Sequence, residues 1–348
     1  MISPEYTSPP VERDTATLPS LFSAQKGWEE RRVYVLTDKP DWEMELQLRS
    51  LLYHIPAKEM VVFPDVSPTE RGLIPTGALV TIDTEQHPDW RKYIKGADIG
   101  CGMAMAPLQI SGRDLKNSQA ELDELYRRLD ERQLIDQLGG NHFVNLAADV
   151  ETDQVTAVVH TGSRGDRQKK LGALVDNPQK YDGEYEPVVA SGIDVREEMI
   201  DVVRSLFGEG GPMGDTIHNT IEHNPDGSVT IRKGVTHITY PDQPQILPSS
   251  ADGLMLIHRP GQMALTLSAS SHGTGRAISR RDMRVSGMND GQNPNIMTPV
   301  QMAGKWPLTE QSNGYHSLER SLDILSRYGF VGDEDQHFLQ PIAGIKQI

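Results

Sequence analysis

The only cysteine of the chain, Cys101, lies in the glycine-rich stretch "GADIGCGMAM" (96–105), three residues after Asp98. A lone cysteine cannot form an intramolecular disulfide, but its thiolate is a strong ligand for divalent cations. Glycine on both sides lets the backbone approach a ligand closely. A small buried hydrophobic residue is the alternative interpretation of a single cysteine, and both interpretations stay open on this stretch alone.

Histidines occur in four further segments: His142 in "LGGNHF", His160 in "VVHTGSRG", His218 in "IHNTIE" and His272 in "ASSHGTGRAISR". Thiolate, imidazole and carboxylate together can surround one or two divalent cations. Each histidine taken singly could be an ordinary hydrogen-bonded loop residue. Their number favours a metal site, although no short C-x-x-C or H-x-x-x-H motif defines one.

Helices and strands are expected to alternate without a regular order around these segments. Apolar spacing predicts helices over 40–55, 118–138, 194–211, 213–223 and 317–329, and strands over 59–66, 154–160, 228–240, 253–258 and 263–270. No G-x-G-x-x-G follows a strand and there is no Walker loop. We therefore expect an α+β fold with several mixed sheets surrounded by helices. Residues 1–25, rich in Pro, Ser and Thr, are expected to be a loosely ordered arm before one large domain over 26–348.

The composition limits the classes of partner. A net charge of −15 argues against a surface that coats nucleic acid, although a local basic groove is compatible with it. No apolar run is long enough to cross a membrane, and the first residues lack the apolar segment of a signal peptide. Together with the lone thiol, this predicts a cytoplasmic protein without a membrane partner.

Several short motifs together resemble the RtcB family of RNA ligases. From about residue 60 to the end they occur in the family's order: "FPDV", "DIGCGM", "GGNHF", "HTGSRG", "IHNTIE", "RKGVTH", "SHGTGR", "GYHSLE" and "PIAGIKQI". The resemblance implies an RtcB-like fold and a ligase that uses GTP and two Mn²⁺ ions. Such enzymes join RNA 2′,3′-cyclic phosphate or 3′-phosphate ends to 5′-hydroxyl ends, in tRNA splicing or RNA repair. They act through a histidine–GMP adduct and an RNA-3′-pp-5′-G end, and an activating protein is a possible further partner.

The same resemblance implies roles for individual residues. His272 would be the nucleophile, with Asp65 near the metals and Cys101 bridging them. Asn141, Arg164 and Arg276 would contact phosphate. The metal ligands would be Asp98, Cys101, His142, His160 and His218, and the nucleotide would contact Asn141, Phe143, Asn145, Ser249, Ser250, His272, Thr274, Tyr315 and Lys346.

Departures from the family pattern fall outside the expected metal ligands and nucleophile. Asn145 replaces a glutamate, Thr274 an alanine and Ser67 a histidine, and "SSAD" (249–252) replaces a Gly-Ser-Met-Gly loop. An amide can serve either purine, so we expect weaker discrimination between GTP and ATP, in a divergent RNA-repair branch. Two alternatives remain: a metal-dependent phosphoesterase acting on RNA ends, and an RNA-binding protein that has lost catalysis.

Overall fold

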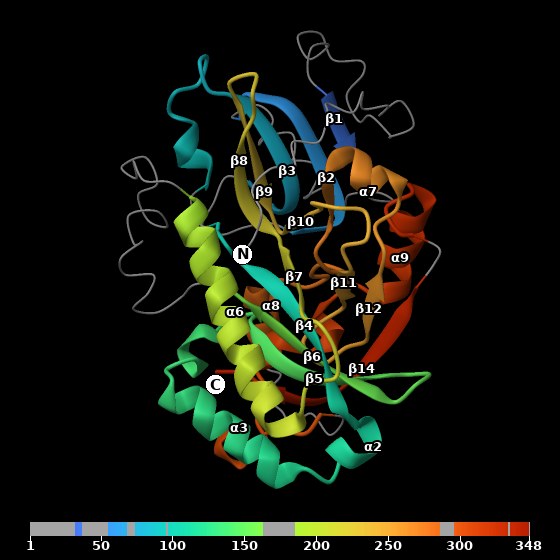
Figure 1. Cartoon of the computed structure of the whole chain (residues 1–348). Coiled ribbons are helices and arrows are strands. Elements are labelled where there is room, and N and C mark those ends of the chain that lie inside the picture. Colours follow the sequence, from blue (N-terminus) through green and yellow to red (C-terminus); the bar gives the residue numbers. More distant parts are fainter. Residues whose placement is uncertain are drawn as a thin grey trace.

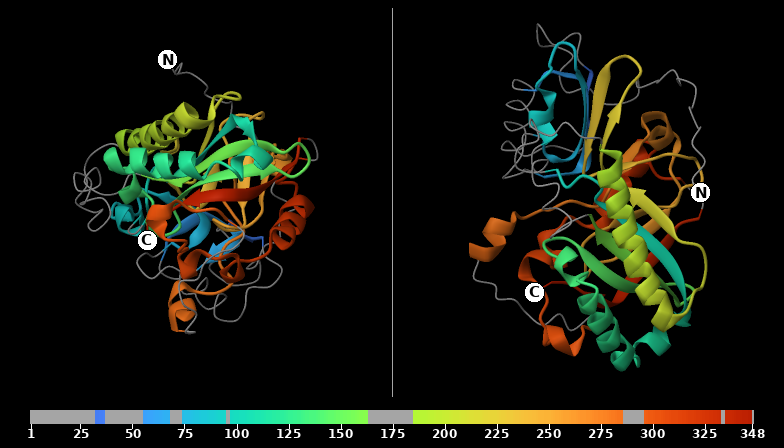
Figure 2. Two further views of the ribbon diagram at one scale, coloured as in Figure 1. Left: turned by 90° about the horizontal axis from the view of Figure 1, so that it is seen from below. Right: turned by 60° about the vertical axis from the view of Figure 1, so that its left-hand side comes forward.

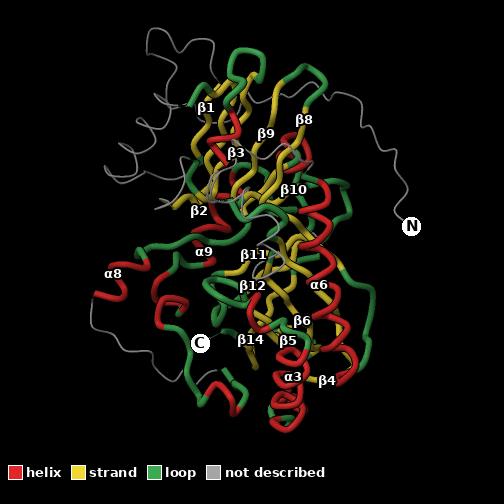
Figure 3. The backbone as a smooth tube through the Cα atoms, turned by 90° about the vertical axis from the view of Figure 1, so that its left-hand side faces the viewer, coloured by secondary structure: helices red, strands yellow, loops and turns green. Residues whose placement is uncertain are grey.

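The computed structural model describes residues 32–36, 55–67, 74–94, 97–162, 185–285, 296–332 and 335–347. Two larger sheets dominate this part of the chain and lie one above the other (Figures 1 and 3). Helices and several sheets are mixed in a single α+β domain, as predicted. The predicted arm (1–25) and the predicted helix over 40–54 lie outside the described residues.

The larger sheet has seven antiparallel strands in the order β11-β12-β14-β5-β6-β4-β7. Its central strands are buried on both faces, because α3 and α6 cover one side and the rest of the molecule the other (Figure 2). The strands are β4 (Gly102–Ser111), β5 (Phe143–Asp149), β6 (Gln154–Thr161), β7 (Gly214–Ile217), β11 (Gln245–Pro248), β12 (Met255–His258) and β14 (His337–Ile345).

The second sheet has five strands in the order β1-β2-β3-β9-β8, with a parallel pair between β1 and β2. A short ladder of β10 with β13 lies beside it. These strands are β1 (Arg32–Val35), β2 (Ala57–Ser67), β3 (Thr76–Asp83), β8 (Asn219–His223), β9 (Ser228–Lys233), β10 (Val235–His237) and β13 (Ala269–Ser271).

The helices follow from apolar spacing and local end signals. In α3 the predicted stripe of Leu122, Leu125 and Leu129 is fully buried. In α6, Gly208 at φ +77° ends the helix. The helices are α2 (Gly112–Leu115), α3 (Gln119–Glu131), α6 (Glu186–Phe207), α7 (Gln262–Leu267), α8 (Arg280–Val285) and α9 (Leu318–Arg327). No helix within the described ranges is both long enough and apolar enough to cross a membrane.

Two predicted elements are wrong. The predicted helix over 213–223 forms β7 and β8, because its residues pair with β4 on one side of His218 and with β9 on the other. The predicted strand over 263–270 is mostly helix α7, which starts after Gly261 and ends at Ser268 in the left-handed conformation. Cross-strand pairing and helix-ending residues determine the secondary structure of these two segments. Apolar spacing in the sequence reveals neither.

The predicted strand over 228–240 is divided at Gly234. This residue has φ +61°, and β9 before it pairs with β3 and β8, whereas β10 after it pairs with β13. Similarly, His218 is the one residue between β7 and β8, where the chain passes from the seven-stranded to the five-stranded sheet. One-residue connections thus join the five-stranded sheet to the β10–β13 ladder at Gly234 and to the seven-stranded sheet at His218, close to the predicted ligands.

Gly192 provides a test of how tightly α6 packs. A methyl group at this position would overlap the backbone carbonyl oxygen of Gly100. In an unconstrained helix, Gly→Ala stabilises by about 1 kcal/mol. We expect Gly192→Ala instead to lower the free energy of unfolding by about 1–3 kcal/mol, as overpacking does.

Urea denaturation measures this effect, with Glu197→Ala at an exposed position of the same helix as the control. A Gly192→Ala variant that is more stable than the parent would contradict the close packing.

Candidate metal centre

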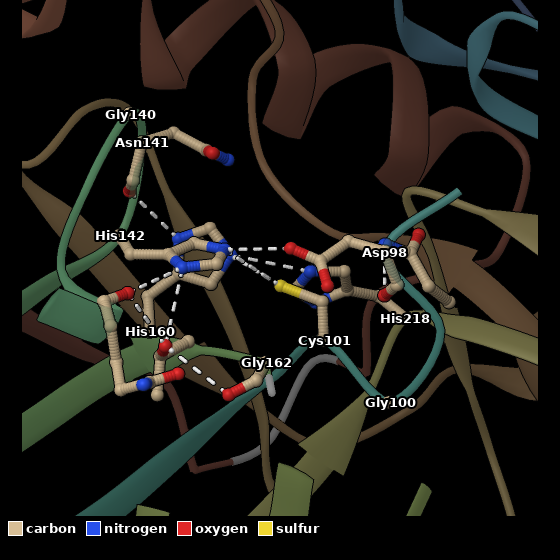
Figure 4. A network of polar contacts seen from close by, with 12 residues as sticks. Asp98, Gly100, Cys101, Gly140, Asn141, His142, His160, Gly162 and His218 are labelled. Atoms are coloured by element: carbon tan, nitrogen blue, oxygen red, sulfur yellow. Dashed lines mark hydrogen bonds and ion pairs between the residues drawn. The ribbon is translucent and has the colours of Figure 1, made fainter. Parts of the chain in front are cut away.

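All five predicted metal ligands meet between the ends of the strands (Figure 4). The Cys101 Sγ lies 3.2 Å from His142 Nε2 and 3.5 Å from His160 Nε2. His160 Nε2 lies 3.2 Å from His218 Nε2, and Asp98 Oδ2 lies 3.6 Å from His142 Nε2. The ligand atoms form two groups that share Cys101: one with His160 and His218, the other with Asp98 and His142. These residues can hold a metal ion.

The hydrogen bonds of the imidazole rings fit a cation. His142 Nδ1 lies 2.9 Å from the carbonyl oxygen of Gln137, and His160 Nδ1 lies 3.0 Å from that of Asn141. A carbonyl only accepts, so each Nδ1 carries the proton and each Nε2 directs a lone pair at the Cys101 sulfur. Burial lowers the pKa of His160 and of His218 well below the ordinary histidine range, which keeps both rings neutral. Unprotonated nitrogens gathered around one sulfur are the arrangement that a cation stabilises.

Backbone geometry delivers these side chains from four places in the chain. Cys101 immediately precedes β4, His142 immediately precedes β5, and His160 lies near the end of β6. The backbone carbonyl of Cys101 accepts a hydrogen bond from the N–H of His218 at 2.9 Å. A side chain at Gly162 would come within 2.9 Å of Asp98 Oδ1, so the chain after His160 needs glycine there.

His272 lies directly beside this cluster. Its ring centroid is 4.8 Å from that of His218, and its Nδ1 is 2.5 Å from Asp65 Oδ2. Asp65 comes from β2 of the five-stranded sheet and is fully buried, and its Oδ1 has no hydrogen-bond partner among the described residues. A carboxylate on Nδ1 fixes the proton there and leaves Nε2 of His272 as the basic nitrogen. The pair has the chemistry of an oriented nucleophile or base.

Four of the predicted nucleotide-binding residues are linked by hydrogen bonds around residues 249–252. Thr274 donates to the carbonyl of Ser249 at 3.0 Å, Ser250 donates to Asp252, and Asn145 donates to the carbonyl of Ala251. Asn145 is fully buried, and its Oδ1 has no hydrogen-bond partner in the described part of the chain. Its amide is therefore held with the acceptor free.

Lys346 and Phe143 contact two of the predicted metal ligands, His142 and His160. The Lys346 ammonium donates to the carbonyls of His142 at 2.6 Å and Gly140 at 3.0 Å, and lies 5.9 Å from the ring centre of Phe143. The Phe143 ring packs against His160 at 5.5 Å. The backbone of Asn141 supports His160, while its side chain points away from the cluster (Figure 4).

Arg276 and Tyr315, both partly buried, form a separate group with the buried Glu310. Arg276 donates to Glu310 Oε1 and to the Tyr315 hydroxyl, both at 2.7 Å, and stacks 4.5 Å from the Tyr315 ring. Burial acts to raise the pKa of Glu310, but Lys346, Arg280 and Arg276 outweigh it and lower that pKa below its ordinary value. Arg276 is thus paired with a carboxylate in this structure. Arg164, also expected to contact phosphate, lies outside the described ranges.

Three buried groups near the site were missed in the sequence. Arg196 and Asp215 pair beside the metal ligands, and the Lys233 ammonium donates to the carbonyl of Ile74. Burial lowers the pKa of Lys233 to about 8. Lys233 precedes Gly234, where an added Cβ would lie 3.0 Å from the His272 ring. The sequence does hold a signal for Arg196: in "DVREEMI" a charged residue stands inside an apolar pattern, which indicates a buried charge.

The comparisons with known proteins add no family to these observations. Neither a scan against protein-family models nor a search of curated proteins gave a match.

Replacing the shared ligand tests the metal centre. We expect Cys101→Ser to lower the number of divalent ions bound per chain, because a serine hydroxyl does not deprotonate next to a cation as a thiol does. Elemental analysis of the purified protein after exposure to Mn²⁺ or Zn²⁺ measures this number. His337→Ala, at a half-exposed histidine paired with Asp149, is the control. The same metal content in Cys101→Ser and in the parent would exclude Cys101 as a ligand.

The buried lysine predicts a pH effect on stability. Lys233 has a pKa of about 8 when folded and about 10.4 in an unfolded chain. Between these values the unfolded chain binds the proton more tightly, so stability rises with pH through this window, and the cost of the buried charge is fully present below pH 8. We expect Lys233→Met to remove this rise, which amounts to at most about 1.4 kcal/mol per pH unit.

Urea denaturation of parent and variant at several pH values between 7.5 and 9.5 measures the difference in slope. Lys305→Met, at an exposed lysine, is the control. Parallel pH profiles for the parent and Lys233→Met would refute the assignment.

Proposed function

We propose that the protein is an RNA ligase that joins a 2′,3′-cyclic phosphate or 3′-phosphate RNA end to a 5′-hydroxyl end, with GTP as co-substrate and two Mn²⁺ ions. The observation that carries the proposal is the contact of two chemistries in one place. A His272–Asp65 pair lies against a cluster of one cysteine, three histidines and one aspartate. A setting in RNA repair and in the cytoplasm, where the free thiol of Cys101 stays reduced, belongs to the same proposal.

His272 is the nucleophile in this proposal. Asp65 holds the proton on Nδ1, so that the lone pair of Nε2 attacks the α-phosphorus of GTP and pyrophosphate leaves. The carboxylate also stabilises the positive charge that develops on the ring. Bound cations would offset the negative charge of the phosphate oxygens.

Two further transfers complete the reaction. The guanylyl group passes from His272 to a 3′-phosphate of RNA, which frees the imidazole. The 5′-hydroxyl of the second RNA then attacks the activated phosphorus, forms the phosphodiester and releases GMP. A cyclic phosphate must first be opened by water to a 3′-phosphate. The five metal ligands would hold the cations, with Cys101 shared between them.

A metal-dependent phosphoesterase acting on RNA ends is the second candidate. One observation favours it: the residues expected to bind the nucleotide already have partners within the protein. Lys346 is bound to two carbonyls, Asn145 to the carbonyl of Ala251, and Arg276 to Glu310. Such an enzyme would use the metal ligands and would need no guanine pocket.

Incubation with α-labelled GTP and Mn²⁺, followed by denaturing electrophoresis, separates the two candidates. A ligase forms a covalent protein–GMP adduct, whereas a phosphoesterase does not. The absence of an adduct, together with release of phosphate from RNA ends, would overturn the ligase in favour of the phosphoesterase.

The role of His272 gives a separate prediction. We expect His272→Ala to retain its bound metal, because the ring is not among the grouped ligands, but to lose the GMP adduct by at least about a thousandfold, as loss of a nucleophile does. It should still seal an RNA that already carries a guanylylated 3′ end. Gel assays with labelled GTP and with preactivated RNA measure the two steps, and His337→Ala is again the control. Peptide mapping of GMP to a different residue would reject this assignment.

A further inference from the structure

Arg196 is a fully buried arginine on α6 that reaches the metal-binding segments. Its Nη1 donates to the carbonyl of Gly100 at 2.8 Å and to that of Thr161 at 2.7 Å. Its Nε and Nη2 donate to the two carboxylate oxygens of Asp215 at 2.6 and 2.8 Å. Gly100 precedes Cys101, Thr161 follows His160, and Asp215 lies three residues before His218. One guanidinium thus contacts the segments that carry three of the predicted ligands.

These contacts lie where the ladders of three strands end. Gly102 of β4 pairs with Thr161 of β6 on one side and with Ile217 of β7 on the other. Beyond Gly102 the chain turns at Gly100, which has φ +85°, so its carbonyl has left the ladder. Two carbonyls and a carboxylate, all acceptors, lie around one guanidinium, and Arg196 donates to each of them. The three strand ends carry Cys101, His160 and His218, which are one of the two ligand groups.

The helix is held against the same carbonyl by a second contact. Gly192, one turn before Arg196, packs so closely on the Gly100 carbonyl that a side chain would overlap it. The position of Gly100, and with it that of the Cys101 sulfur, is therefore fixed by backbone contact on one side and by a charged hydrogen bond on the other.

The chemistry of the pair requires arginine and a carboxylate. Arginine presents several donors in a rigid planar fork, whereas lysine is a flexible point charge that cannot make this set of bonds in one geometry. The positive charge of Arg196 acts on His218, so an unpaired guanidinium here would also repel a cation. Asp215 neutralises that charge while leaving the donors in place.

We propose that Arg196, neutralised by Asp215, is a positioning residue that sets the spacing of Cys101, His160 and His218 and thereby the affinity for one of two cations. The second ligand group, Asp98 and His142 with Cys101, depends on it less, because only its Cys101 adjoins a carbonyl that Arg196 binds, whereas all three members of the first group lie at the strand ends that Arg196 contacts. The inference rests on the proposed metal centre and is independent of the ligase reaction.

Cobalt titration of single-site backgrounds tests this. Co²⁺ bound to a thiolate gives a charge-transfer absorption that reports binding without any nucleotide. His142→Ala leaves the Cys101–His160–His218 group, and His218→Ala leaves the Asp98–Cys101–His142 group. We expect Arg196→Lys to weaken Co²⁺ binding about 10–100-fold in the His142→Ala background, as loss of a group that orients ligands does, and by less than about threefold in the His218→Ala background.

Arg204→Lys is the matched control, since Arg204 lies two turns further along α6 and also donates to a backbone carbonyl, that of Gly211. It should leave both affinities unchanged. Equal affinities with and without Arg196→Lys in the His142→Ala background, or equal weakening in both backgrounds, would overturn the proposal. If Arg196→Lys does not fold, Asp215→Asn in the same two backgrounds decides by the same criterion. If Arg196→Lys weakens Co²⁺ binding only in the His142→Ala background while the parent protein forms no GMP adduct, the proposed ligase activity is wrong and the role of Arg196 stands.

Discussion

The structure depends on the meeting of unprotonated imidazole nitrogens with one sulfur in a buried space. Backbone carbonyls hold the protons of His142 and His160 on the outer nitrogens, and burial keeps the rings neutral. Lone pairs so close together destabilise one another unless a positive charge lies between them. Four chain segments bring these groups to the same point, where a bound cation would offset their mutual repulsion.

The residues around the site make two kinds of contact: some support the predicted metal ligands, and others pair polar side chains with one another. On the side of the strand ends, every group supports the ligands: Arg196 binds carbonyls, Gly162 gives room to Asp98, and the Cys101 carbonyl receives the N–H of His218. On the side expected to bind a nucleotide, side chains satisfy one another, as Arg276 does with Glu310. Rigid support thus surrounds the metal ligands, whereas the polar groups further out would have to exchange partners to bind a substrate.

Much of the site could be predicted from the sequence because its ligands are single residues beside glycine or at strand ends. Cys101, His142 and His160 were found in this way, and the stripe of Leu122, Leu125 and Leu129 gave α3. The segment around His218 was expected to be a helix, because its strand pairing depends on β4 and β9, which lie far away in the sequence. Arg196 and Asp215 escaped notice for a similar reason: a salt bridge between a helix and a strand leaves no spacing pattern, and only the fold brings the two charges together.

The short connection at His218 has a consequence for how the two layers are held. The chain leaves the seven-stranded sheet at Ile217 and enters the five-stranded sheet at Asn219, so His218, whose N–H donates to the carbonyl of Cys101, links the two layers directly. Asp65, which orients His272, belongs to the five-stranded layer, whereas His160 belongs to the other. Because Asp65 and His160 belong to different layers, the relative position of the two layers sets the distance between the His272 ring and the cysteine–histidine cluster.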